Sequence, residues 1–299
     1  YLLNNFSLDP CRYKASENQI RASAKAESSK NRKNTETVIS VREAWFRYEK
    51  DSKDILCGMN FDVHAGELTC IVGGNGAGKT TALMTAAGVF SPYRGKVKYR
   101  GKPISTFRKD KGSAGKIGVL VQNPLCCFVM DSVAEELEAT AKAYKLPRSG
   151  IEEVIDIMQL QSVLGSNPYD ISGGELQRAA IAKLLLPEPE VIFLDEATKG
   201  MDAFFKAEFG ALLRRLAARG TAIVLVSHDI EFCAEFADRC AMFFNGTVIA
   251  EGTPHEVFLG NSFYTTSACR ISRGIIPDAL TSEQVIDYAN RCERKKNDA

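Results

Sequence analysis

One glycine-rich segment constrains the fold of this chain more than any other feature of its sequence. Residues 73–80 read GGNGAGKT and match the pattern G-x-x-x-x-G-K-[ST]. The apolar run ELTCIV precedes this segment at residues 67–72, and the pattern of residues 80–88 is typical of a helix. In a strand–loop–helix context, backbone N–H groups close around phosphate oxygens, and the helix dipole favours the negative charge. The segment therefore predicts a phosphate-binding loop in an α/β domain.

The side chains of this loop predict that the phosphate belongs to a nucleoside triphosphate with its Mg²⁺ ion. Lys79 can reach the β- and γ-phosphates, and Thr80 can ligate the Mg²⁺ ion that accompanies them. The nucleotide-binding residues that we predict here form one continuous run: Gly73, Gly74, Asn75, Gly76, Ala77, Gly78, Lys79, Thr80 and Thr81.

A second apolar run ends in two carboxylates. Residues 191–196 read VIFLDE, and ligands of an open parallel sheet lie at the carboxyl ends of its strands. Asp195 is therefore placed to hold Mg²⁺, and Glu196 is placed to activate the attacking water as a general base. Taken alone, the pair could be a solvated acidic turn, but the phosphate loop favours the catalytic interpretation.

A short segment upstream of Asp195 carries a resemblance to a known family. Residues 171–175 read ISGGE and resemble the LSGGQ signature of ABC (ATP-binding cassette) ATPases. Ile and Glu replace the usual first and last residues, while the serine and the two glycines are intact. In that family the signature acts on ATP held by the opposite subunit. The resemblance thus implies a second cassette as partner, in a homo- or heterodimer, and signature contacts from Ser172, Gly173 and Gly174.

Four further positions match the ABC family in the right order, so that the resemblance covers about residues 38–254. Tyr48 resembles the aromatic residue that stacks on adenine, and Gln122 resembles the Q-loop residue that senses Mg²⁺ and the membrane partner. Asp202 ends a D-loop-like KGMD, and His228 resembles the switch histidine that contacts the γ-phosphate. The resemblance implies that the catalytic residues are Glu196, His228, Gln122 and Lys79, and that the metal is held by Thr80, Gln122 and Asp195.

Each of these four positions also has a plain structural interpretation. Tyr48 could pack on a strand, and Gln122 could be a solvated loop residue. Asp202 could cap the helix that follows it, in addition to any role at the site. His228 could be an ordinary surface histidine.

The expected fold class is α/β, with a P-loop NTPase (RecA-like) core, an antiparallel β subdomain, an inserted helical subdomain and a C-terminal extension. Short apolar runs at 191–194 and 222–226 suit buried parallel strands, and Asn245–Gly246 indicates a hairpin. The helical patterns of the expected insertion lie at 133–145, 151–164 and 174–186. The expected domain boundaries are a linker or tail at 1–36, a cassette at 37–255 with its helical insertion at about 125–187, and an extension at 256–299.

Composition narrows the function further. The chain has 38 Lys and Arg against 37 Asp and Glu, and this net charge of +1 gives no support to nucleic-acid binding. No charge-free run is long enough to span a bilayer, so any membrane role is expected to come through a partner. Its nine cysteines form no Cys-x-x-Cys pair and indicate structural thiols in a reducing cytosol.

Two segments resemble one branch of the ABC family, the ATPases of energy-coupling factor (ECF) transporters, which import vitamins and transition-metal ions. These segments are QNP at 122–124 with DSVAEEL at 131–137, and residues 260–286 near the C-terminus. The resemblance implies an ATP-hydrolysing subunit, peripheral on the inner face of the cell membrane through a transmembrane subunit. Two alternatives stay open: a soluble ABC ATPase in translation, repair or cofactor assembly, and a non-hydrolysing structural cassette. The C-terminal segment could also be a generic extension.

Overall fold

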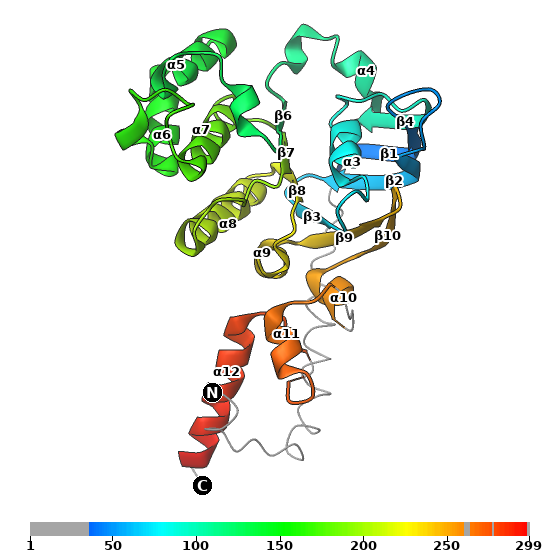
Figure 1. The fold of residues 1–299 in the computed structure, drawn as a ribbon, viewed down its shortest axis with the longest axis vertical. Helices are drawn as coiled ribbons and strands as arrows, with labels where there is room; N and C mark the ends of the chain where they lie inside the picture. The colour runs from blue at the N-terminus through cyan, green and yellow to red at the C-terminus, as the bar shows by residue number, and fades with distance from the viewer. Residues whose placement is uncertain (1–35, 260–263, 277, 298–299) are drawn as a thin grey trace.

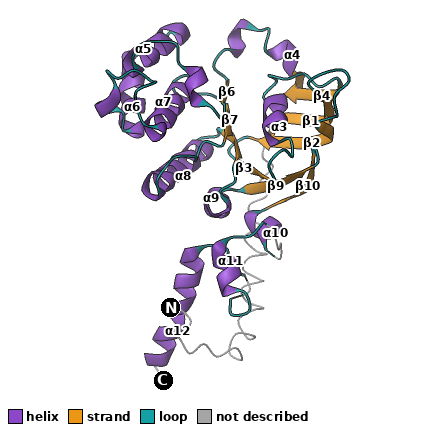
Figure 2. Cartoon of the chain, viewed as in Figure 1, coloured by secondary structure: helices purple, strands orange, loops and turns teal. Residues whose placement is uncertain are grey.

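The computed structural model describes residues 36–259, 264–276 and 278–297 (Figure 1). It contains two sheets, a group of helices beside them, and a helical extension at the C-terminal end (Figure 2). This is the α/β architecture with an antiparallel subdomain and a helical insertion that the sequence predicts. The predicted linker at 1–36 lies outside the described residues except for Glu36.

The larger sheet has six strands in the order β10-β9-β3-β8-β7-β6. β3 pairs in parallel with β8 and β9, and β7 pairs in parallel with β6 and β8. β10 runs antiparallel to β9 after the predicted Asn245–Gly246 turn, where both residues have positive φ. The strands are β3 (Leu68–Val72), β6 (Ile117–Leu120), β7 (Val191–Asp195), β8 (Ala222–Val226), β9 (Arg239–Phe244) and β10 (Thr247–Gly252).

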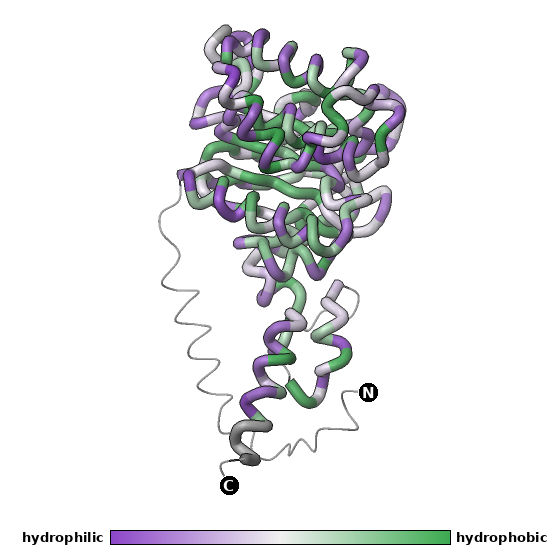
Figure 3. Tube along the Cα trace, turned by 90° about the vertical axis from the view of Figure 1, so that its left-hand side faces the viewer, coloured by the Kyte–Doolittle hydropathy of each residue, from purple (hydrophilic) through white to green (hydrophobic). Residues whose placement is uncertain are grey.

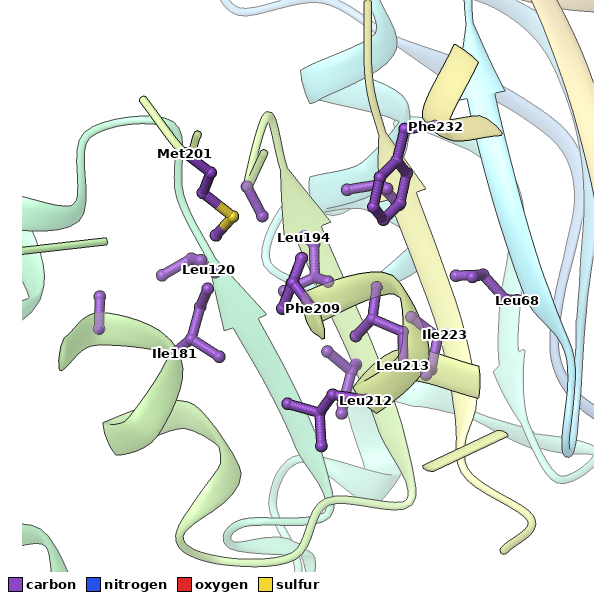
Figure 4. Packing of buried hydrophobic residues seen from close by; sticks show 14 of the residues in the cluster. Leu68, Leu120, Ile181, Leu194, Met201, Phe209, Leu212, Leu213, Ile223 and Phe232 are labelled. Carbon is purple, nitrogen blue, oxygen red and sulfur yellow. The ribbon is translucent and has the colours of Figure 1, made fainter. Parts of the chain in front are cut away.

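Side chains of the central strands alternate between two hydrophobic clusters. On β7, for example, Ile192 and Leu194 point into one cluster, whereas Val191 and Phe193 point into the other. The first cluster lies against helices that follow the strands, as Figure 4 shows for Leu194 beside Phe209. Because both faces are covered, every residue of β3, β7 and β8 is buried, as their apolar sequences predict.

The smaller sheet is antiparallel and has the order β2-β1-β4-β5. Its inward-facing side chains, such as Val41 and Phe61, complete the second hydrophobic cluster together with helix α3. The hydrophobic part of the trace in Figure 3 follows these layers through the middle of the cassette. The elements are β1 (Thr37–Phe46), β2 (Leu56–His64), β4 (Arg94–Tyr99), β5 (Lys102–Pro103) and α3 (Lys79–Ala86).

One carboxylate ties the two sheets together. Glu190, which precedes β7, accepts hydrogen bonds from Tyr99 Oη at 2.6 Å and from Arg100 Nη2 at 3.1 Å on the side of the smaller sheet. Its other oxygen accepts from Lys116 Nζ at 2.8 Å. Partial burial acts to raise the pKa of Glu190, but the hydrogen bonds from Lys116, Tyr99 and Arg100 outweigh it and lower the pKa to about 2.

Helices fill the chain between and after the core strands. The predicted helix at 151–164 is too long, because Gln159 adopts a left-handed conformation with φ 52° and ends the helix. A short 3-10 turn follows at Gln161–Val163. The helices of this part are α4 (Ile104–Phe107), α5 (Val133–Tyr144), α6 (Arg148–Met158), α7 (Gly173–Leu185), α8 (Ala203–Ala218) and α9 (Ile230–Phe236).

A buried ion pair joins two helices of the insertion. Glu136 on α5 is 1% exposed, and its carboxylate pairs with Lys183 Nζ of α7 at 2.5 Å. The other carboxylate oxygen accepts from the backbone amides of Val129 and Met130, and Lys183 also donates to the carbonyl of Cys127. Burial acts to raise the pKa of Glu136, but these bonds outweigh it and hold the pKa below its ordinary value.

The C-terminal part consists of α10 (Pro254–Phe258), α11 (Ser267–Ser272) and α12 (Ser282–Asn297). α10 crosses the predicted boundary at 255, and α11 and α12 project from the end of the molecule (Figure 1). None of the helices in the described part of the chain combines the length and the apolar character that crossing a bilayer requires.

Candidate nucleotide-binding site

The glycine-rich segment forms the loop between the buried strand β3 and helix α3, as predicted. Gly73 has φ 155°, and a Cβ at this position would lie 2.2 Å from the carbonyl oxygen of Phe243. Gly78 precedes the helix with φ 100°, and α3 begins with no side-chain cap. The first N–H groups of the helix therefore remain available to an anion bound in the loop.

Lys79 lies inside this loop rather than in solvent. Its side chain is almost fully buried, and Nζ donates to the carbonyls of Gly73 and Gly74 at 2.9 Å each. Burial lowers the pKa of Lys79, and the negative charges of Glu196 and Asp195 oppose that shift. The ammonium group is thus held where phosphate oxygens would meet the loop.

Asp195 has the environment of a metal ligand. It ends β7, is 1% exposed, and neither of its carboxylate oxygens accepts a hydrogen bond within the described residues. Burial raises the pKa of this carboxyl, and the neighbouring Thr80 hydroxyl offsets the rise only in part. A buried carboxylate without a partner is costly unless a cation balances it. Asp195 and Thr80 therefore fit Mg²⁺, which takes one or two protein oxygens and completes its shell with phosphates and water.

Three predicted catalytic side chains come together at the next residue. Glu196 Oε2 accepts from Gln122 Nε2 at 3.1 Å, and Glu196 Oε1 lies 3.3 Å from His228 Nε2. The three residues follow β7, β6 and β8, which are neighbours in the sheet. Glu196 has φ 53°, a conformation that costs a non-glycine residue about 1–3 kcal/mol and that is often found at functional sites. Its amide donates to the Val226 carbonyl at 2.9 Å, which holds the turn in place.

Tyr48 stands at the edge of the loop with 60% of its surface exposed. Its hydroxyl lies 3.0 Å from the Thr81 hydroxyl on α3. Edge-to-face contacts with Phe46 and Phe90 support the ring at centroid distances of 5.2 and 5.7 Å. The ring is therefore fixed on one side and open on the other, which suits stacking against a planar base.

The ISGGE segment begins helix α7 with a capping box. Glu175 N donates to Ser172 Oγ at 3.3 Å, and Ser172 N donates to Glu175 Oε2 at 2.9 Å. Hydrogen bonds from the Ser172 hydroxyl and amide lower the pKa of Glu175. Glutamate is thus suited to this position, because its carboxylate accepts both donors. A Cβ on Gly173 would meet nothing within 4 Å, whereas one on Gly174 would lie 3.1 Å from the Gly200 carbonyl.

Asp202 caps helix α8, as its structural interpretation predicts, because its carboxylate accepts from Phe205 N at 2.8 Å. The contact between Gly174 and Gly200 places the signature beside the turn that leads to Asp202. In the part of the chain that the structure describes, no hydrogen bond joins Ser172 or Asp202 to the phosphate loop. The signature and its neighbouring turn form one group of residues, and the phosphate loop with its carboxylates forms another.

Sequence reasoning missed residues that support the catalytic turns. Ser227 Oγ lies 3.4 Å from Thr198 Oγ1 and accepts from Asp229 N at 3.0 Å, which connects the turns after β7 and β8. Asp229 caps α9 and pairs with Lys206 at 2.6 Å. Asp229 could have been found from the sequence, because an aspartate directly before a helical segment is a typical N-cap. The pairing with Lys206 has no such signal, because it depends on how α8 and α9 pack.

Comparison with known proteins identifies this arrangement. The ABC transporter family model matches residues 56–199. A Bacillus cereus protein named as an ABC transporter ATP-binding protein is 38% identical over 258 residues, which cover 86% of this chain and 46% of that protein. The energy-coupling factor transporter ATP-binding protein EcfA of Methanocaldococcus jannaschii is 33% identical over 226 residues, 74% of this chain and 81% of EcfA.

The fold agrees with these sequence matches. The structure of cbiO1 from Clostridium perfringens, described as part of the ABC transporter complex cbiONQ, aligns with a TM-score of 0.65 and 30% identity. The alignment covers 74% of this chain and 90% of cbiO1. The fold is that of an ATP-binding cassette of the P-loop NTPase class. The chain belongs to the ABC transporter family, whose ATP-binding cassettes are the ATPases of transporters. It spans about half the length of the Bacillus relatives.

Proposed function

We propose that the chain hydrolyses ATP to power an ECF-type importer of a vitamin or a transition-metal ion. The observation that carries the proposal is the convergence of Gln122, Glu196 and His228 beside Asp195 and the phosphate loop. The names of two relatives support the transporter type, since EcfA is called an energy-coupling factor transporter protein and cbiO1 belongs to the cbiONQ complex.

In the proposed mechanism, the loop from Gly73 to Thr81 binds the phosphates of ATP, while Tyr48 stacks on its adenine. Lys79 exchanges its two carbonyl partners for phosphate oxygens. Asp195 and Thr80, with Gln122 at the edge of the site, would hold Mg²⁺, which neutralises phosphate charge when bound. Glu196 orients and activates the attacking water, and His228 contacts the γ-phosphate. Positioning and electrostatics supply most of the rate acceleration.

The signature supports a two-cassette arrangement. Helix α7, which begins at the signature, lies in the helical group away from α3, the helix that follows the phosphate loop (Figure 1). Ser172, Gly173 and Gly174 would therefore face ATP held by a second cassette. The space around Gly173 is open, which leaves room for the ATP of the second cassette. Two cassettes would close around two nucleotides and reopen after hydrolysis. This motion would be transmitted to the transmembrane subunit.

A transmembrane subunit would dock near Gln122. The segment that follows Gln122 exposes 81% of Val129 and 41% of Met130 to solvent. The same two residues line a cavity of about 400 Å³ between β6, α5 and α7. An apolar side chain of a membrane partner would fill such a cavity, and the chain would then be held on the inner face of the membrane.

The catalytic part of the proposal is tested with Glu196→Gln. We expect ATP turnover to fall at least about 100-fold, the usual contribution of a general base, while ATP affinity stays within about threefold of the parent. Lys79→Ala is the matched control, because it should lose nucleotide binding instead. Turnover of Glu196→Gln above a tenth of the parent rate would exclude Glu196 as the base.

The transport part is tested by purifying the tagged full-length protein from its native cells in detergent. Mass spectrometry should find a polytopic membrane protein and a second cassette. A small membrane protein among them would point to the substrate. Ribosomes, repair factors or assembly proteins without a membrane protein would contradict the transport function and favour a soluble ABC ATPase.

A further inference from the structure

The C-terminal part of the chain comes close to the phosphate loop at one residue. The hydroxyl of Tyr264 lies 3.5 Å from the position that a Cβ of Gly74 would occupy. Its ring is partly buried and packs against the first hydrophobic cluster, the one that contains Leu194 and Phe209. The next two residues, Thr265 and Thr266, are buried. This stretch therefore belongs to the body of the cassette, although α11 and α12 project from it (Figure 1).

Gly74 is a sensitive place for such a contact. Its carbonyl is one of the two that accept the Lys79 ammonium. A hydroxyl this close to Gly74 leaves less room for the peptide to turn, and the position of Lys79 depends on the carbonyl of that peptide. The Tyr264 hydroxyl thus lies beside the residue whose carbonyl accepts the Lys79 ammonium.

A second contact joins the same C-terminal part to the helix behind His228. Both the amide and the hydroxyl of Ser267 donate to Glu231 Oε1, at 3.0 and 2.9 Å. Glu231 lies in the first turn of α9. Burial acts to raise the pKa of Glu231, but the bonds from Ser267 outweigh it, and the net shift is downward. The start of α11 is therefore fixed to α9 by a charged acceptor with two donors.

We propose that the C-terminal extension positions the nucleotide site through two side chains, Tyr264 on the phosphate loop and Ser267 on the helix behind His228. Both are positioning residues, because neither touches the groups that react. The inference rests on the proposed function, since it takes residues 73–80 to bind ATP. The two contacts act on different steps: Tyr264 on nucleotide binding and Ser267 on turnover.

The first test is Tyr264→Phe, which removes only the hydroxyl. We expect the Kd for trinitrophenyl-ATP and the KM for ATP to rise about three- to tenfold, the range that the loss of one hydroxyl's interactions gives. The kcat at saturating ATP should stay within about twofold. Tyr288→Phe, in α12, is the matched control and should leave both constants unchanged. A Tyr264→Phe variant with the parent Kd would overturn the role of Tyr264.

The second test is Ser267→Ala, which leaves Glu231 with one donor instead of two. We expect kcat to fall about three- to tenfold with little change in KM, because the affected helix carries the His228 turn. Ser267→Thr keeps the hydroxyl and should restore kcat. Parent kcat in Ser267→Ala, or a rise in KM like that of Tyr264→Phe, would overturn the separate action of this contact.

Nucleotide binding by the parent protein distinguishes failure of this inference from failure of the proposed function. A parent that does not bind trinitrophenyl-ATP contradicts both. A parent that binds the nucleotide, with all variants equal to it, contradicts the inference alone. If the purified parent binds but hydrolyses too slowly to measure, the Kd of Tyr264→Phe still decides whether the extension positions the loop.

Discussion

At the scale of single residues, the site contains a carboxylate that costs stability. Asp195 is buried and its oxygens accept no hydrogen bond within the described residues, and burial raises its pKa. Such a group is retained where a bound cation makes use of its charge. Mutation of Asp195 should therefore raise the stability of the nucleotide-free protein and weaken its binding of Mg²⁺ and ATP.

We expect Asp195→Asn to stabilise the nucleotide-free protein by about 1–2 kcal/mol, a few degrees in Tm, because the buried charge is removed. The raised pKa sets the pH dependence. The cost of the charge is absent below the unfolded pKa of about 3.9 and grows as pH rises through the folded pKa. The stability difference between variant and parent should therefore grow over this range and stay constant at neutral pH, as thermal unfolding can measure.

The same variant should lose the stabilisation that Mg²⁺ and ATP give the parent together. Asp131→Asn, an exposed change in the segment before α5, serves as control and should show neither effect. A lower Tm in the absence of ligand, or an undiminished response to Mg²⁺ and ATP, would contradict the assignment of Asp195.

Much of the site could be predicted because its residues lie in continuous segments. The phosphate loop, the Asp195–Glu196 pair and His228 each follow an apolar strand, and parallel strands bring their carboxyl ends together. The contacts of Glu190, Lys183 and Tyr264 could not be predicted in this way. Each joins segments that are far apart in the chain, and no spacing in the sequence encodes how those segments pack.

At the scale of elements, the insertion is held together by charge as well as by apolar packing. The Glu136–Lys183 pair fixes α5, α7 and the segment that carries Val129 and Met130. Because α7 begins at the signature, this pair connects the signature helix with the surface where a membrane subunit would dock. The helical periodicity of 133–145 correctly predicted α5 but gave no sign of this bond.

We expect Lys183→Met to destabilise the protein by about 3–5 kcal/mol, because it leaves the Glu136 carboxylate buried without its cation. Adding Glu136→Gln should recover part of the loss, since the amide oxygen can still accept from the backbone. Urea unfolding of the single and double variants measures both. Lys142→Met, an exposed change on α5, should cost less than about 0.5 kcal/mol. Equal losses in the single and double variants would contradict the ion pair.

At the scale of the whole molecule, the two sheets must keep a fixed relation, because Tyr48 follows a strand of the smaller sheet and Asp195 ends a strand of the larger one. Glu190 supplies a polar connection through Tyr99, Arg100 and Lys116. The second hydrophobic cluster spans the same interface. A nucleotide that contacts both Tyr48 and Asp195 depends on this interface staying closed.

We expect Glu190→Gln to lower stability by about 1 kcal/mol at neutral pH, a value reduced for the partial exposure of the carboxylate. The pKa of Glu190, about 2 in the folded protein, sets the pH range over which this contribution is lost. The contribution is fully present above the unfolded pKa of about 4.3 and is lost as pH falls toward 2. Unfolding of parent and variant from pH 7 to pH 2 should show their difference shrinking below about pH 4.5. A difference that does not change with pH would contradict the charged role.

The hydrogen bonds of Lys79 also determine which anions the loop can accept. Its ammonium already has two carbonyl acceptors, so an incoming anion must compete with the chain itself. A weakly charged anion offers little more than those carbonyls do and would leave Lys79 where it is. A triphosphate with its metal ion brings several charged oxygens at once and shifts the competition in its favour. Selectivity against the smaller anions of the cell would then follow from an exchange of partners, without any steric barrier at the entrance.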